Sequence, residues 1–504
     1  MMELHYALWQ NIPFACIILP LASAAFTSVM KPRLARWWTM VVLTIVTVLS
    51  GVISAQYLLG AESYVFPMGH YYAPIGNEIR AGALEALTAL FFSIIMLLSL
   101  MGGMKKLDEH IDGNKQNLYY VILLLLTAAL MAQVYTNDLF TSYVFLEIMT
   151  LAACALIAIR KRGRTLVAAT RYMIMNLIGS GLFLLGIVIL YDLTGHLLME
   201  SIRGQVAQIA ATGEYAQPLT VVIALFVIGL AIKSALFPFH TWVPDAYGYS
   251  TPTSQAVLSS LVSKGYIFLL VKIMYRVIGV DVIAATGIDD VLFVFAIAGM
   301  IMGSLSALRQ NDVRRMIAFS SVAQIGYIYL GMAMGTEAGM MAAMFHLFSH
   351  AVCKSMLFLA AGGLADASGN SKLFRDLRGA GYRSPIAGVA FTIGALSMVG
   401  FPFLGGFVSK LNLALAGIAL SPVKASIVLV TLAISTMFNT MYFLRTVITL
   451  YRKPLDGASY PVEKGQRGFC FNAALVLLAL INITLGIFSQ TVVNMITAGL
   501  GMFG

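Results

Sequence analysis

The sequence is poor in charged residues. Only 11% of its 504 residues are Asp, Glu, Lys or Arg, whereas 60% are hydrophobic. Soluble domains carry roughly 25% charged residues, because a large part of their surface must face water. This composition excludes a water-soluble fold for most of the chain, and lipid must be its surrounding solvent.

Cysteine is also scarce. The four cysteines stand far apart in apolar segments, with no C-x-x-C pair and no Cys/His cluster. Iron–sulfur and zinc sites need clustered ligands, so we expect no metal and no cofactor in this chain. No redox or hydrolytic site is evident either, and any redox chemistry must belong to a partner. The cysteines are Cys16, Cys154, Cys353 and Cys470.

Long apolar segments are what the chain has in abundance. Fourteen of them are each long enough to cross a hydrocarbon core of about 30 Å as a helix. The segment 385–418 is too long for one straight span and contains Pro402, so we expect a broken helix there. The sequence predicts an all-α polytopic membrane protein. The segments lie near residues 11–30, 38–59, 82–104, 117–136, 138–160, 168–194, 219–239, 251–278, 288–308, 315–334, 340–361, 385–418, 424–450 and 469–494.

The first segment, Asn11–Met30, has no convincing small-residue cleavage site, and we interpret it as a retained helix. Lys and Arg gather in alternate loops, whereas the intervening segments hold Arg80 and Arg203. Cytoplasmic loops carry such an excess, which predicts an inner-membrane protein with both termini outside. The net charge of +10 is then a topogenic signal and does not indicate a nucleic-acid partner. The basic loops are at residues 31–36, 105–115, 160–171, 309–315, 372–383 and 452–467.

Several ionisable residues fall inside the apolar segments. Glu147, Lys233, Lys264 and Lys410 each lie well within a predicted helix. A charge at the centre of a membrane helix costs about 2.5–3.5 kcal/mol, so it normally faces a cavity, a partner or an ion pathway. A carboxylate stabilises a charged lysine beside it, so a Glu147–Lys233 pair could couple two proton movements. The alternative is a structural ion pair that fixes helix packing.

Five further cations lie within or at the edges of these segments. Lys354 is internal and needs a partner or a pathway. The other four stand near helix ends, and we expect their side chains to extend to the membrane interface. They are Lys272, Arg276, Lys424 and Arg445.

His346 and His350 stand four residues apart, so both face the same side of a helix. Imidazole changes its charge near neutral pH, which suits a proton relay. A metal pair is a rival interpretation, but the sequence offers neither a third ligand nor an H-E-x-x-H motif. Each histidine could also serve only a polar contact within the bundle.

The tripeptide Phe-Pro-Phe occurs twice, at 237–239 and 401–403, each time within nine residues of an internal lysine. Proline interrupts the hydrogen bonding of a helix. Paired broken helices in the two halves of a transporter indicate inverted repeats and an ion site near the membrane midplane.

The stretch from Lys233 to Lys264 resembles the signature of the antiporter-like subunits of respiratory complex I. It begins with Lys-Ser-Ala-Leu-Phe-Pro-Phe-His-Thr-Trp-Val-Pro-Asp-Ala-Tyr. That family includes the Mrp sodium/proton antiporters and membrane-bound hydrogenases. The segment 345–363 and Asp376-Leu-Arg-Gly most resemble the D-type subunit of the Mrp antiporters and its hydrogenase counterparts. The resemblance extends over essentially the whole chain.

The resemblance implies roles for individual residues. Glu147 matches the family's helix-5 glutamate, and Lys233 matches the helix-7 lysine that pairs with it. Lys264 matches the central helix-8 lysine, and Lys410 matches the residue on broken helix 12 that ends the outward route. The histidines on helix 11 correspond to His346 and His350.

The resemblance also implies an organisation and a function. Two inverted five-helix repeats would occupy residues 117–278 and 288–450, between helices 1–3 at 1–116 and helix 14 at 469–504. We expect a proton-translocating subunit of an Mrp-type Na+/H+ antiporter, or of a related NADH:quinone oxidoreductase-like or hydrogenase complex. Its partners would be neighbouring antiporter-like subunits, and its ions H+ and Na+. The rival functions are a carrier of an organic solute and a non-conducting membrane anchor of a redox complex.

Overall fold

The computed structural model describes residues 8–68, 71, 76–160, 162–453 and 468–501. Loop cations predicted at Lys161, Lys464 and Arg467 lie outside these residues. Within the described part of the chain, thirteen helices are long and apolar enough to cross a membrane. The shorter α17 (Pro385–Val399) and α18 (Gly405–Ile418) form the broken span that the sequence predicts. The predicted all-α polytopic fold is confirmed.

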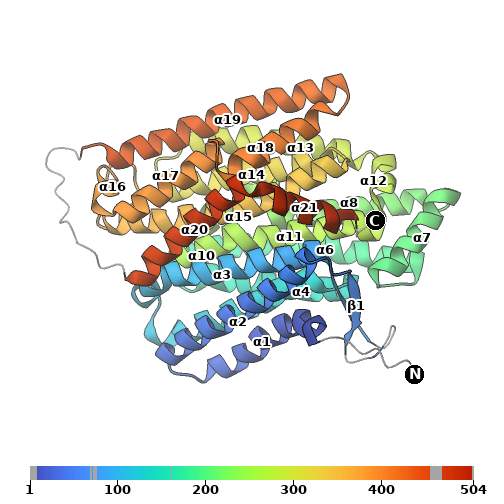
Figure 1. Ribbon diagram of the computed structural model, residues 1–504, viewed down its shortest axis with the longest axis horizontal. Coiled ribbons are helices and arrows are strands. Elements are labelled where there is room, and N and C mark those ends of the chain that lie inside the picture. Colours follow the sequence, from blue (N-terminus) through green and yellow to red (C-terminus); the bar gives the residue numbers. More distant parts are fainter. Residues whose placement is uncertain (1–7, 69–70, 72–75, 161, 454–467, 502–504) are drawn as a thin grey trace.

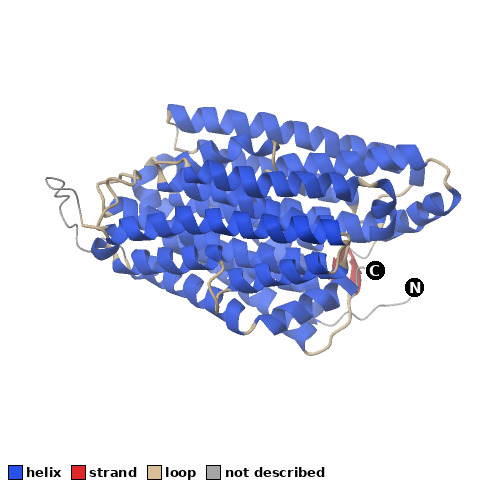
Figure 2. Ribbon diagram, turned by 90° about the horizontal axis from the view of Figure 1, so that it is seen from above, coloured by secondary structure: helices blue, strands red, loops and turns tan. Residues whose placement is uncertain are grey.

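The helices lie side by side along the long axis of the molecule, in several layers (Figures 1 and 2). The first part of the chain contains η1 (Leu8–Asn11), α1 (Ile12–Ser28), α2 (Pro32–Leu58), β1 (Tyr64–Pro67), β2 (Glu78–Ala81), α3 (Ala83–His110) and η3 (Gly113–Lys115). Next come α4 (Gln116–Tyr135), α5 (Leu139–Ala158), α6 (Gly163–Thr194), α7 (Met199–Thr212), α8 (Ala216–Ser234), η4 (Phe239–Trp242) and α9 (Val243–Tyr249).

One long helix is then built from α10 (Pro252–Val257), η5 (Leu258–Val262), α11 (Ser263–Lys272) and η6 (Ile273–Ile278), of which η5 and η6 are π-helical. The remaining elements are α12 (Val280–Thr286), α13 (Ile288–Leu308), α14 (Val313–Ala333), α15 (Glu337–Asp366), α16 (Ala380–Arg383), α19 (Pro422–Tyr451), α20 (Phe469–Ile487) and α21 (Ser489–Gly501).

The centre of the bundle consists of helices that are buried on every side. Apart from the half-buried Tyr275, the span from Pro252 to Ile278 is buried, as are most of α15 and nearly all of α14. The outer faces of α2, α6 and α19 instead expose large apolar side chains such as Trp37, Leu177 and Val430. Such an inside-out pattern fits lipid as the solvent, because apolar faces need not be hidden from it.

The two ends of the bundle differ. The antiparallel β1–β2 hairpin, the surface helix α7 and α12 lie at one end, together with the start of α1 and the end of α21 (Figure 1). The short α16 lies at the opposite end (Figure 1). The hairpin, α7 and α12 are absent from the predicted elements, because none of them has a long apolar run.

Both predicted helix breaks are present. The helix α8 ends at Ser234, and Ala235 follows it in the left-handed region with φ 68°. The helix α17 ends at Val399, and Gly400 has φ 98°, a conformation that costs glycine least. Each break exposes the carbonyl end of a half-helix inside the bundle, where it carries partial negative charge.

Two of the four cations expected at the interface are buried instead, so that prediction was wrong for them. Lys272 is fully buried, and its Nζ donates to the carbonyls of Val134 (3.0 Å) and Thr136. Arg276 is 3% exposed and pairs with Glu85 at 2.6 Å. Tertiary packing explains their burial, because α7 and the C-terminal turn of α4 cover this end of the helix. Lys424 and Arg445 do lie near the surface, where Lys424 pairs with Asp290.

Candidate functional site

A glutamate on α5 and a lysine on α8 form an ion pair inside the bundle. The Nζ of Lys233 lies 3.7 Å from Oε1 of Glu147 and donates to Oγ1 of Thr150 at 2.8 Å. It also lies 5.2 Å from the ring centroid of Tyr266. Lys233 is fully buried in the last turn of α8, where the helix dipole favours a cation. The predicted pairing is thus seen directly.

Lys264 lies directly after the π-helical segment η5. Its Nζ donates to the carbonyl of Ser259 at 2.5 Å and to Oγ of Ser263 at 3.4 Å, and no salt bridge joins it to a carboxylate of the described residues. A π-helical turn alters the local bonding pattern and often marks a functional position. The hydroxyl of Ser259 in turn lies 3.1 Å from that of Ser321 on α14.

Lys354 is a further buried lysine, to which the sequence alone assigned no role. Its Nζ donates to the carbonyl of Ile317 at 3.0 Å and to the hydroxyl of Ser320. Ser320 precedes Ser321 in the chain, so α14 presents adjacent hydroxyls to the surroundings of Lys264 and of Lys354. The signal that could have identified Lys354 is its spacing of four residues from His350, which places both on one face of α15.

The two histidines on α15 stack with ring centroids 6.0 Å apart and planes inclined by 15°. Nδ1 of His346 lies 2.9 Å from Oγ of Ser409 on α18, and its ring stacks on Tyr327 at 5.3 Å. Neither ring nitrogen of His350 has a hydrogen-bond partner among the described residues. Buried polar atoms of this kind are usually satisfied by ordered water.

Lys410 reaches the second helix break. Its Nζ donates to the carbonyls of Met398 (2.8 Å) and Val399 (3.0 Å) at the end of α17. It also lies 5.3 Å from the ring centroid of Tyr327, the residue that stacks on His346. A cation at the negative end of a half-helix repeats the arrangement of Lys233 at the end of α8.

The structure brings some of the six predicted residues into contact. Glu147 meets Lys233, His346 stacks on His350, and Lys410 and His346 both lie against the ring of Tyr327, whereas Lys264 bonds to Ser259 and Ser263 instead. Each of the four lysines donates to a serine or threonine hydroxyl. Other buried polar atoms along these helices have no partner among the described residues, and they mark places where water would be held. They belong to Thr253, Gln255, Ser260, Gln324 and Ser349.

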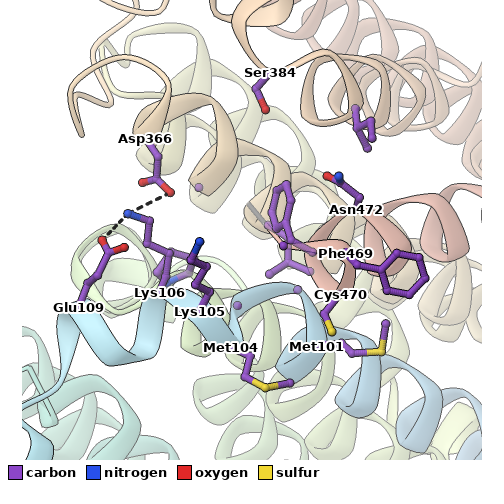
Figure 3. A pocket seen from close by; sticks show the side chains of 18 of the residues that line it. Met101, Met104, Lys105, Lys106, Glu109, Asp366, Ser384, Phe469, Cys470 and Asn472 are labelled. Carbon is purple, nitrogen blue, oxygen red and sulfur yellow. Dashed lines mark hydrogen bonds and ion pairs between the residues drawn. The ribbon is translucent and has the colours of Figure 1, made fainter. Parts of the chain in front are cut away.

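No group of three or more metal-ligating side chains occurs among the described residues. A separate cavity of about 360 Å³ lies at the α16 end of the bundle (Figure 3). There Lys106 pairs with Glu109 and, at 3.4 Å, with Asp366, while Phe469 and Cys470 contribute an apolar wall. None of the six predicted residues lines this cavity.

Fold and site together define a polytopic α-helical membrane protein with lysines and histidines in its interior. The chain belongs to the family described as NADH:quinone oxidoreductase/Mrp antiporter, TM, whose model matches residues 136–438. This match includes all six predicted site residues.

Relatives of two kinds cover nearly the whole chain. The N-type subunit of NADH-quinone oxidoreductase from Desulforudis audaxviator is 32% identical over 96% of this chain and 97% of its own length. The D-type subunit of the Na(+)/H(+) antiporter from Bacillus subtilis is 26% identical over 93% and 92%. A chain of the archaeal membrane-bound sulfane sulfur reductase superposes with a TM-score of 0.87, at 28% identity and 98% coverage of both chains.

Proposed function

We propose that this chain conducts protons as the antiporter-like subunit of a multisubunit Mrp-type Na+/H+ antiporter, or of a related ion-pumping respiratory or hydrogenase complex. Other membrane subunits are its partners. The observation that carries the proposal is the set of lysines inside the bundle, of which Lys233, Lys264 and Lys354 are fully buried and Lys410 is half-buried. Each is bonded to a hydroxyl or to helix-end carbonyls. A purely structural bundle would not need four such cations in its interior.

The proposed route begins at Glu147 and Lys233 and passes Lys264, Lys354 and the histidine pair to Lys410. Each lysine can release a proton to a neighbouring hydroxyl or to water and regain one when the charge beside it changes. The side chain of Glu147 is 23% exposed, so this residue connects the buried Lys233 to the surface of the chain. We assign to it the coupling of Lys233 to a neighbouring subunit.

The two helix breaks support the division of the chain into inverted repeats at residues 117–278 and 288–450. In each proposed repeat a lysine stands at a helix break: Lys233 lies in the last turn of α8, and Lys410 donates to the carbonyls at the end of α17. Broken helices of this kind place ions near the membrane midplane in transporters.

The distribution of loop cations supports an orientation in which the α16 end faces the cytoplasm of a bacterial or archaeal cell. The start of α1 and the end of α21 lie at the other end (Figure 1), so both termini would be outside. None of the four lysines of the proposed route lines the cavity in Figure 3, which favours proton conduction over carriage of an organic solute.

The proposal is tested with the intact complex in membrane vesicles, where Na+-dependent proton movement is followed with a pH-sensitive dye. Lys233→Ala and Glu147→Ala should each abolish the signal, because they remove the two ends of the ion pair, while the complex still assembles. Lys424→Ala is the matched control, since that lysine is a surface cation paired with Asp290. Unchanged transport in both site variants would overturn the proposal.

A further inference from the structure

A second cavity, of about 630 Å³, lies on the loops at the α16 end of the bundle. The end of α3, the α5–α6 connection, the end of α9, the start of α14 and the segment after α15 all contribute to its wall. Five cations and a single carboxylate line it, so its surface is strongly positive. These charged residues are Arg160, Arg162, Arg164, Arg314, Lys372 and Glu109.

The deepest of these cations lacks a full set of partners. Arg314 is 8% exposed, and its Nε has no hydrogen-bond partner among the described residues. The same holds for Nε of Arg160 and Nδ1 of His110, which line the same cavity. Three buried nitrogens facing one cavity without acceptors are costly, because burying a polar group unbonded costs free energy.

The nearby carboxylates are already paired with lysines, and one of these lysines belongs to this same cavity. Asp312 pairs with Lys372 at 3.1 Å and accepts from the backbone amides at the start of α14. Glu109 and Asp366 both pair with Lys106, in the neighbouring cavity of Figure 3. Asp366 and Asp312 attract Arg314, but no ion pair joins a carboxylate of the described residues to Arg160 or Arg314, so these two arginines are only partly compensated.

The arginines also repel one another. Burial, together with the charges of Arg162 and Arg314, lowers the pKa of Arg160 to about 10. Its Nη1 is held by the carbonyl of Tyr249 at 3.1 Å, so it cannot move away freely. A bound anion would relieve this repulsion.

The backbone adds a further attraction for an anion. The 32-residue helix α6 begins at Gly163 in the wall of this cavity. The position of a Cβ on Gly163 would meet no atom within 4 Å, so the space beside the first turn of the helix is open. The amides of Thr165 and Leu166 bond to the carbonyl of Arg162, so an anion would be held by the amides that precede them. Helix N-termini bind phosphate through such amides and through the helix dipole.

We propose that this cavity binds a phosphate group, held by Arg160, Arg314 and Lys372 and by the N-terminus of α6. Arginine matches phosphate oxygens with paired N–H donors, which suits the buried Arg314 and the half-buried Arg160. The phosphate can come from a phospholipid headgroup or from a free anion. The outer face of α6 exposes Leu166 and Val167 beside the cavity, which an acyl chain could cover.

Positive charge alone does not make such a site. Another cavity at this end of the molecule, of about 760 Å³, is lined by Arg375, Arg378, Arg445 and Arg452. The side chain of Arg375 is 74% exposed and pairs with Asp376, and Arg445 and Arg452 are exposed as well. These arginines are exposed to solvent, which stabilises their charge. A variant in this cavity is therefore a matched control.

The test uses the intact complex in two preparations. In nanodiscs of phosphatidylcholine, inorganic phosphate is titrated against chloride at equal ionic strength, and the melting temperature is recorded. In detergent, native mass spectrometry counts the phosphatidylglycerol that each complex retains. Phosphate-dependent stabilisation would identify a free anion as the source, and retained phosphatidylglycerol would identify a lipid.

Arg314→Gln should weaken the observed binding at least tenfold, and Arg162→Gln should do so severalfold without disturbing a buried group. Arg375→Gln should leave it unchanged. Absence of both binding signals overturns the proposal, as does an equal loss in Arg375→Gln. A cross-link from Lys372 to an acidic segment of another chain of the complex, with neither phosphate nor phosphatidylglycerol bound, would also overturn the proposal. It would mean that this segment occupies the cavity. Transport is not part of the readout, so the result is independent of the proposed proton route.

Discussion

Lys233 on α8 and Glu147 on α5 face each other at 3.7 Å, and Thr150 lies one helical turn beyond the glutamate with its hydroxyl 2.8 Å from the same ammonium. The lysine is therefore held by two groups from a single face of α5. The carboxylate balances its charge, and the hydroxyl also lies 2.9 Å from the hydroxyl of Tyr266. Lys233 therefore has its countercharge on one side, at Glu147, and a hydrogen-bonded connection on the other, through Thr150 to Tyr266.

Thr150→Val should reduce proton transport about tenfold, which corresponds to ~1.4 kcal/mol. Valine has the same shape but lacks the hydroxyl, so Lys233 loses an acceptor and its link to Tyr266. Hydrogen bonds to charged groups contribute about 1.5–3 kcal/mol. Thr170→Val on α6 is the control, because Thr170 is exposed and bonds only to the backbone of its own helix. A dye-quenching assay in vesicles that gives equal rates for both variants would contradict the role of Thr150.

Lys354→Gln should block transport as severely as Lys264→Gln. The carbonyl of Ser259 accepts from Lys264, and the hydroxyl of Ser259 lies beside that of Ser321. Ser320, next to Ser321 in the chain, accepts from Lys354, and no other ammonium of the described residues is bonded to these serines. Glutamine retains a donor for the carbonyl of Ile317 but cannot release a proton. Normal transport by Lys354→Gln, measured with an assembled complex, would remove Lys354 from the route.

The spans and the positions of the ions within them were predictable from the sequence, because membrane helices must be long and apolar and charges inside them stand out. Pro238 and Pro402 likewise reveal the helix breaks. The serines on α14 could not be identified in this way. Ser320 and Ser321 are common residues in helices, and their role depends on which side chains the packing of α14 against α15 places beside them.

Lys272 and Arg276 show where the sequence led to a wrong prediction. Their position near the end of an apolar segment indicated an interfacial location, since sequence gives depth along one helix but not what covers it. In the structure, α7 and α4 cover that end, so a buried ion pair forms instead. The surface helix α7 is amphipathic and short, which is why hydropathy did not reveal it.

That buried ion pair gives a prediction for stability. Glu85→Ala should destabilise the protein by about 3–5 kcal/mol, because Arg276 would remain buried without its countercharge. The double variant Glu85→Leu with Arg276→Met should recover most of the loss, since it removes both charges together. Thermal unfolding of the purified protein in detergent measures both. A double variant that is less stable than Glu85→Ala would show that the pair has another structural partner.

Ser409→Ala should slow proton transport severalfold by disconnecting the histidine pair from α18. The hydroxyl of Ser409 lies 2.9 Å from Nδ1 of His346 and also donates to the carbonyl of Gly406, so it fixes the orientation of the imidazole next to the helix that carries Lys410. Without it, His346 keeps its stacking on Tyr327 but loses the contact that aligns a ring nitrogen. Ser426→Ala removes an exposed hydroxyl on α19 that bonds only to the backbone, and it should leave transport unchanged. If both alanine variants transport at the wild-type rate in vesicles, proton transfer between α15 and α18 does not depend on this contact, and the route to Lys410 must pass through water alone.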